Sequence, residues 1–471
     1  MKCLPASACL AAAFACLACA SATPAPERPA SVVAPAARPA AAVQRPSSPA
    51  PAAAPESREG RLIARMLKRV ETARGLDAKK SVPGLLLDRA ALIARVKEHV
   101  SRELPAEAIR NEGLTLELLG FVPTQFDYEA AEYRLLQDQL AGYYEPADGT
   151  MYMASDLADD EADATLAHEL VHALQDQRWN LQERSKYRPG DGDRSEAVSA
   201  LAEGDATSAM FDVIIARAAP GSGKTALDVP EDVFSEQIRQ GMNQGSAAAA
   251  PQIMRSSLAA PYIYGTLFVN ALRRHGGWEA VNRAWSDPPT TSEQIMHVDK
   301  WLAHEPAAHV GAPTCASLGA GWSVADEDSE GELGARVAFE QWLDPTAAAE
   351  ASAGWGGDRG VLFSNGDRAA FAWRLRYDVD GDTKPGDTRA SRAFRAITHG
   401  VDQSLGAPAV RDASFDCHER ADRGPLAVSR SGTDIVFVAG PAKVSSGGPW
   451  TSAGSCALAR KWLKEIASQP P

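Results

Sequence analysis

Apolar residues recur every three or four positions along much of the chain, which is the spacing that gathers them on one face of an α-helix. Residues 61–139 show this spacing, and so do residues 258–285. The apolar positions that define the first of these stretches are Leu62, Ile63, Met66, Leu67 and Val70, followed by Leu92, Ile93, Val96 and Val100. We therefore predict that this part of the chain is mostly helical.

Two parts of the chain depart from the helical pattern. Residues 142–154 alternate around a Pro-Ala-Asp-Gly turn, which predicts a hairpin of two short strands. After Pro306, glycine-rich turns separate short apolar runs such as those at 370–376 and 434–438. We predict an α+β fold that is mostly helical, with a first domain over residues 58–305 and a C-terminal α+β lobe with a small antiparallel sheet over residues 306–471.

The beginning of the chain has the composition of an export signal and a spacer. Residues 1–22 combine one lysine with an apolar core and end in Ala-Ser-Ala, which predicts a signal peptide cleaved after Ala22. Residues 23–57 are mostly alanine, proline and serine, a composition that predicts an extended, disordered linker. Cys19 is the candidate for a lipid anchor, so the exported chain is expected to be periplasmic, anchored to the outer membrane as a lipoprotein, or secreted.

Charge and hydropathy narrow the range of partners. The formal net charge of −13 argues against nucleic acid and against anionic lipid surfaces. Beyond the signal, no run is apolar enough for a transmembrane helix, so we expect none in the mature chain. About 410 residues remain after the linker, which is ample for a sizeable core and for two lobes.

The sequence His-Glu-Leu-Val-His at 168–172 carries the clearest chemistry. Residues 162–177 hold no glycine or proline, and their apolar positions follow helical spacing. On a helix His168 and His172 share a face and can reach one metal ion, while Glu169 lies beside the open side of that ion. This arrangement is typical of a zinc-dependent peptidase.

A catalytic zinc site needs a third protein ligand and keeps a fourth position for water. Residues 195–217 read as a second apolar helix with two interior carboxylates, Glu196 and Glu203. We favour Glu203, because its neighbours are apolar and a buried carboxylate requires a metal or another partner. Glu196 is the alternative.

With these ligands, Zn²⁺ would lower the pKa of a bound water, and Glu169 would act as the general base toward a peptide carbonyl. The developing oxyanion needs a further hydrogen-bond donor, for which Tyr262, Tyr264 and His297 are the candidates. Because Tyr262 and Tyr264 are two residues apart, a helix would send them to different sides, and only one of them could serve.

The chain resembles exported bacterial HExxH metallopeptidases of the gluzincin type, in which two histidines and a downstream glutamate bind zinc. The resemblance covers most of the mature chain and implies a zincin-like catalytic domain with a small edge hairpin, and a peptide or protein substrate. The matching segments are residues 139–145, 151–153, 166–177, 203–206, 261–265, 291–297 and 354–358.

One position departs from that family. Many gluzincins carry an aspartate four residues after the ligand glutamate, where it holds a zinc-bound histidine, but this chain has Thr207 there. Asp205 and Asp176 are the candidates for the orienting group, since a metal-bound imidazole usually donates its second N–H.

Three cysteines lie outside the signal, namely Cys315, Cys417 and Cys456, and we expect Cys417 and Cys456 to form a disulfide after export. The leading hypothesis for function is an exported zinc peptidase. The alternatives are a zinc hydrolase acting on a non-protein amide of the cell envelope, and a tethered binding protein that keeps the fold without turnover. The presence of Glu169 argues against the last, because a protein without catalysis does not need the base.

Overall fold

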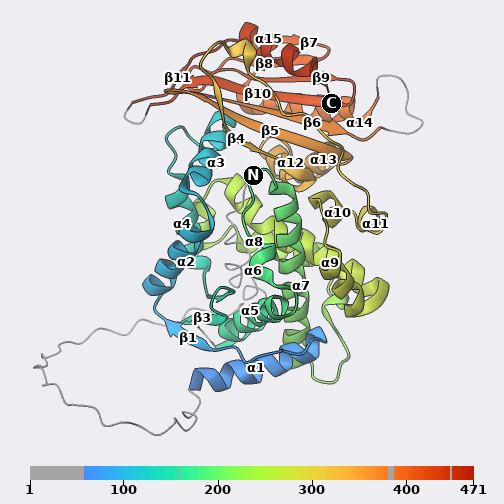
Figure 1. The fold of residues 1–471 in the computed structure, drawn as a ribbon. Coiled ribbons are helices and arrows are strands. Elements are labelled where there is room, and N and C mark those ends of the chain that lie inside the picture. The colour runs from blue at the N-terminus through green and yellow to red at the C-terminus, as the bar shows by residue number, and fades with distance from the viewer. Residues whose placement is uncertain (1–57, 158, 380–386, 446–447, 471) are drawn as a thin grey trace, which may run out of the picture.

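The computed structural model describes residues 58–157, 159–379, 387–445 and 448–470. The signal, the linker and Cys19 lie outside the described residues. The fold is α+β and mostly helical, as the sequence predicts. Figure 1 shows a helical part at one end of the molecule and a large sheet at the other. Among the described helices, none combines the length and the apolarity that crossing a membrane requires.

The helical part contains the elements from α1 to α11. α5 and α7 match the two helices that the sequence predicts around the histidine motif and Glu203, and α9 covers the predicted stretch 258–285. α9 runs over 35 residues but bends at Gly276 and Gly277, where the backbone is not helical. The helices are α1 Arg58–Arg74, α2 Arg89–Glu103, α3 Ala106–Leu119, α4 Tyr128–Gln139, α5 Asp159–Trp179, α6 Leu181–Arg184, α7 Gly192–Ala218, α8 Glu231–Gly241, α9 Gln252–Ser286, α10 Ser292–Met296 and α11 Val298–Leu302.

A three-stranded sheet lies against α5. The predicted hairpin forms as β2, Gly142–Glu145, and β3, Thr150–Ala154, which pair antiparallel. A third strand, β1 at Gly84–Leu87, pairs parallel with β3, so the helical prediction for this stretch is wrong. The apolar run of β1 satisfies a strand as well as a helix, and its partner lies far along the chain.

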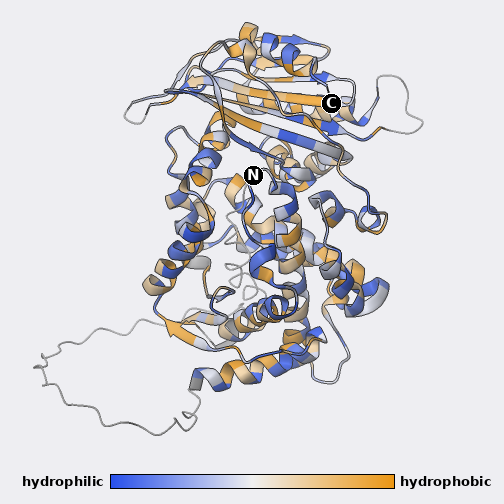
Figure 2. Cartoon of the chain, viewed as in Figure 1, coloured by the Kyte–Doolittle hydropathy of each residue, from blue (hydrophilic) through white to orange (hydrophobic). Residues whose placement is uncertain are grey.

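The second sheet is larger than the sequence suggests, with eight antiparallel strands in the order β4-β5-β6-β10-β9-β8-β7 and β11 beside β10. Figure 2 shows hydrophobic residues running along β10, and buried residues line both faces of the sheet. The elements are β4 Ser323–Asp328, α12 Gly331–Phe339, α13 Pro345–Ser352, β5 Trp355–Asn365, β6 Arg368–Tyr377, α14 Arg389–Leu405, β7 Val410–Asp412, β8 Phe415–His418, β9 Leu426–Ser431, β10 Asp434–Lys443, β11 Thr451–Ser452 and α15 Cys456–Ala467.

Helices cover both faces of this sheet. α12, α13, α14 and the end of α3 pack on one face, and α15 packs on the other. The predicted disulfide between Cys417 and Cys456 is confirmed, and it joins β8 to α15. Cys315 is the free thiol among the described residues.

Two arginines of the β8–β9 loop join the sheet to the helical part. Arg420 donates to the carbonyls of Leu118 and Leu119, and Arg423 donates to the carbonyl of Glu117, all in the last turn of α3. The final carbonyls of a helix have no partner within it, so these guanidinium groups serve as its C-terminal cap.

The domain boundary that we predict at residue 306 remains a prediction.

α7 and α9 cross at a pair of glycines. A Cβ atom added to Gly204 would overlap the backbone of Gly265, and one added to Gly265 would overlap the carbonyl of Ala200. Only residues without a side chain permit this approach. This contact fixes the position of α7 at Gly204, the residue next to Glu203.

We expect Gly204→Ala to lower the free energy of unfolding by about 3 kcal/mol, because the added methyl group must push two helices apart. Zinc affinity should fall as well, since Glu203 moves with α7. Urea denaturation and zinc titration measure both effects. The matched control is Gly276→Ala, where the added Cβ meets only side-chain atoms at 3.4 Å. Equal stability of the two variants would contradict the proposed helix contact.

Candidate metal centre

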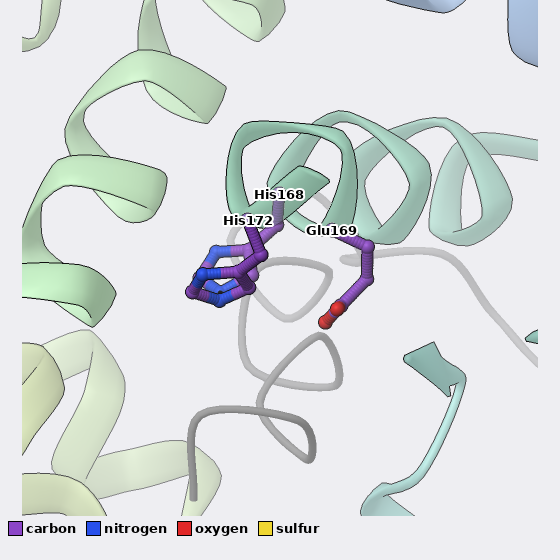
Figure 3. A group of neighbouring side chains, drawn as sticks. All are labelled: His168, Glu169 and His172. Atoms are coloured by element: carbon purple, nitrogen blue, oxygen red, sulfur yellow. Dashed lines mark hydrogen bonds between the residues drawn. The ribbon is translucent and has the colours of Figure 1, made fainter. Parts of the chain in front are cut away.

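α5 presents the histidine motif toward the interior. His168, Glu169 and His172 are almost fully buried. The two histidines are four residues apart, so their imidazoles lie on the same face of the helix. Figure 3 shows both rings and the Glu169 carboxylate projecting from the same side of the helix. The candidate ligand atoms of the three residues all lie within 4.8 Å of one another.

Glu203 of α7 meets the two imidazoles. Its Oε2 lies 3.1 Å from His168 Nε2 and 3.5 Å from His172 Nε2, and the two Nε2 atoms are 3.1 Å apart. Glu203 is fully buried. In the described part of the chain its other oxygen, Oε1, has no hydrogen-bond partner.

These separations fit a shared metal ion. Two ligands at about 2.0–2.2 Å from a tetrahedral zinc ion lie about 3.3 Å apart, and the three observed separations fall close to that value. Zn²⁺ prefers imidazole nitrogen and carboxylate oxygen in this combination. His168, His172 and Glu203 are therefore the residues that would hold a zinc ion.

The electrostatics of the cluster also favour a cation. Burial opposes a charge on His172, but the Glu203 carboxylate raises the pKa of His172 to about 9. Burial alone would raise the pKa of Glu203, yet the two imidazoles hold that pKa below its usual value. The buried carboxylate thus draws positive charge to the point where the three ligand atoms meet.

Glu169 is held from the hairpin side. Its Oε2 accepts a hydrogen bond from the backbone N–H of Tyr144 in β2, at 2.8 Å. Among the residues described, Oε1 of Glu169 has no hydrogen-bond partner and is buried. Burial raises the pKa of Glu169 to about 8, although His172 and the Tyr144 N–H oppose the shift. One oxygen is fixed and the other is left to meet a ligand.

A second set of buried side chains orients His172. Gln175 accepts a hydrogen bond from His172 Nδ1 through Oε1 at 2.8 Å, and its amide donates to the Ala202 carbonyl and to Asp205 Oδ2. Those two partners can only accept, so the amide nitrogen must face them and Oε1 must face the imidazole. Nδ1 of His172 therefore carries a proton, so Nε2 is the nitrogen that would give its lone pair to a metal ion, which would displace the Nε2 proton on binding.

Asp205 is held in turn by α1 and α9. Arg74 of α1 donates to both carboxylate oxygens, at 2.5 and 3.2 Å, and the Trp285 indole N–H donates at 2.8 Å. Arg74, Asp205 and Trp285 are all fully buried. The ion pair is complete within the protein, so Asp205 remains a fixed acceptor for Gln175.

The expectation that Asp205 or Asp176 contacts a ligand histidine directly is wrong for His172, whose Nδ1 contacts Gln175. Asp205 acts one residue further away, and Asp176 instead accepts from the Tyr144 hydroxyl at 3.0 Å. The sequence signal was an amide three residues after His172 on the same helix, which is close enough to reach the ring.

The remaining candidates lie in different surroundings. Glu196 lines a small cavity with residues of α9 and α12, whereas Glu203 contacts the histidines. The Tyr262 ring lies 6.1 Å from the His168 ring, centroid to centroid. Tyr264 packs against the Arg336 guanidinium, and His297 pairs with Glu332 at 2.9 Å. The observed contacts favour Tyr262 among the three oxyanion candidates.

Comparison with known proteins places only part of the chain. Residues 321–446, which span β4 to β10, match a family described as a domain of unknown function, DUF8575. No curated protein matches the chain. A crystal structure from Chloroflexus aurantiacus, described as a candidate hydrolase with a novel fold, aligns with a TM-score of 0.32 and 17% identity, over 53% of this chain and 90% of that one. A likeness this slight assigns neither fold nor activity.

We expect Gln175→Leu to weaken zinc binding by roughly 10- to 100-fold, because His172 loses the acceptor that fixes its tautomer. Competition with a fluorescent zinc chelator measures the affinity. Gln177→Leu is the matched control, since Gln177 lies on the same helix and hydrogen-bonds the backbone of Lys79 and Lys80 instead. Equal affinities in the two variants would show that Gln175 does not orient a ligand.

Proposed function

We propose that the chain is an exported zinc-dependent peptidase of the gluzincin type. The observation that carries this proposal is the convergence of His168, His172 and Glu203 at tetrahedral ligand spacing. Oε1 of Glu169, which has no hydrogen-bond partner within the described residues, lies beside them. A carboxylate next to such a cluster is the arrangement that hydrolysis of an amide requires. Export rests on the composition of residues 1–22.

A zinc ion bound there would activate water and polarise the carbonyl of the scissile bond. The positive charge of a bound zinc ion would lower the pKa of Glu169 and favour its ionised form. Glu169 then acts as the general base: its Oε1 accepts a proton from the attacking water, and the same oxygen returns the proton to the leaving amine. The Tyr144 N–H keeps the carboxylate in place during both transfers, because it binds the other oxygen.

Tyr262 supplies the hydrogen bond to the developing oxyanion. The side chain is almost fully buried on α9, beside His168. A phenol fixed in a site that excludes water stabilises negative charge more strongly than the same group in solvent. Tyr264 and His297 contact other partners and are assigned no part in the reaction.

The Glu169→Gln variant tests the proposal most directly. We expect the full chain and this variant to bind zinc equally, because the amide changes no ligand. Casein cleavage should fall by roughly 10²–10⁴-fold in the variant, which has lost the general base. Elemental analysis gives the zinc content, and a fluorescence assay on labelled casein gives the rate.

The same experiment separates the alternatives. Zinc in both proteins without cleavage by either would reject a general peptidase and favour a hydrolase of cell-envelope amides or a binding protein. Absence of zinc from the parent would reject the metal centre. A His172→Gln variant provides the reference for a chain that lacks a ligand.

Tyr262→Phe should lower kcat by roughly 10²–10³-fold while leaving KM within about 3-fold, because the hydroxyl acts on the transition state. Tyr264→Phe is the matched control, two residues along the same helix, and should leave kcat unchanged. Steady-state kinetics on a fluorogenic peptide measure both parameters. A loss of kcat in Tyr264→Phe, with Tyr262→Phe unaffected, would reverse the assignment.

A further inference from the structure

A second group of potential ligands lies in the sheet lobe, far along the chain from the histidine motif. Asp416 and His418 alternate along β8, so both side chains lie on the same face of the strand, and Asp402 reaches them from α14. His418 Nε2 lies 3.0 Å from Asp416 Oδ1 and 3.3 Å from Asp402 Oδ1. The side chains of His418 and Asp416 are 4% and 2% exposed.

The hydrogen bonds of this group are incomplete. Both ring nitrogens of His418, and Oδ1 of Asp416, are buried without a hydrogen-bond partner in the part of the chain that is described. The carboxylate oxygens therefore lie beside Nε2 without accepting a hydrogen bond from it. A charged ring would leave two buried N–H groups unpaired, and a neutral ring protonated at Nδ1 would place the Nε2 lone pair opposite the lone pairs of the carboxylate oxygens.

A shared cation would bind the Nε2 lone pair and the carboxylate oxygens together, which removes the repulsion between their lone pairs. Ligand atoms of one tetrahedral ion lie about 3.3 Å apart. Each directs a lone pair at the ion, so the lone pairs do not point at the neighbouring ligand atoms. The two observed separations match that spacing. One imidazole nitrogen with two carboxylate oxygens is a donor set suited to a divalent ion of the zinc class.

Arg411 completes the outer side of the group. Its guanidinium contacts Asp416 Oδ2 and lies 2.7 Å from Asp402 Oδ1, which leaves Asp416 Oδ1 and the imidazole facing inward. Its side chain is 44% exposed, so it neutralises the carboxylates from the solvent side. With a neutral imidazole, the two carboxylates and this arginine leave one net negative charge, which a divalent cation would offset.

A third acidic group shows the contrast. The ammonium of Lys300 donates to Glu293 and Glu305 at 2.6 Å, and to Asp378 at 2.9 Å. There a side-chain cation already occupies the position between the three carboxylates. At Asp402, Asp416 and His418 the arginine binds Asp416 Oδ2 and Asp402 Oδ1, and among the described residues it leaves Asp416 Oδ1 and both imidazole nitrogens without a hydrogen-bond partner.

We propose that Asp402, Asp416 and His418 bind a divalent metal ion of the zinc class that ties α14 to β8. The ion would act as a structural staple on β8, next to the disulfide that ties the same strand to α15. This site is independent of the proposed peptidase centre, and neither proposal requires the other.

Zinc stoichiometry of the full chain tests the second site. After equilibration with Zn²⁺ and gel filtration, elemental analysis should find about two zinc ions per chain in the parent and about one in His418→Gln. Asp402→Asn should also hold about one, and it covers the case in which His418→Gln does not fold, because the Asp402 side chain is partly exposed. His399→Gln, an exposed histidine on the same helix, should keep two.

Further variants separate this proposal from the peptidase centre and from an ordinary ion-pair network. If His168→Gln alone removes the single zinc of a one-zinc parent, the second site is rejected and the peptidase centre stands. If His418→Gln alone removes it, the reverse holds. Arg411→Gln should bind zinc at this site more tightly by roughly 10-fold, since a competing positive charge is gone; weaker binding would overturn the proposal.

Discussion

The close crossing of α7 and α9 is the constraint on which the rest of the helical part depends. Gly204 and Gly265 let the two backbones touch, and the ligand carboxylate of Glu203 lies at the residue before this contact. α5 packs against α7 on another side, so α7 carries Glu203 between its contact with α9 and the histidines of α5. The position of α7 beside the candidate metal centre thus depends on two residues that have no side chain.

Buried side chains of α1, α5 and α7 support the candidate metal centre. A line of buried side chains runs from Arg74 through Asp205 and Gln175 to His172, and each member is fixed by the next. α1, which supplies the arginine, begins directly after the predicted spacer. The first described helix therefore belongs to the support of the site.

Much of this arrangement could be predicted from the sequence, because its signals are local. Helical spacing gives α5 and α7, and the four-residue separation of His168 and His172 gives their common face. The Cys417–Cys456 pair followed from a small number of choices. β1 could not be predicted, since a four-residue apolar strand is defined by its distant partner β3. The role of Gln175 could not be predicted, because its amide oxygen faces His172 only when its amide N–H groups find acceptors on α7.

The two arginines that cap α3 affect how the molecule unfolds. Arg420 and Arg423 belong to the sheet lobe, yet they satisfy carbonyls at the end of a helix in the other half. Separating the halves would remove the cap from the last turn of α3, while both guanidinium groups would keep partners within the sheet lobe. The end of α3 should therefore fray when the sheet lobe unfolds or is cut away.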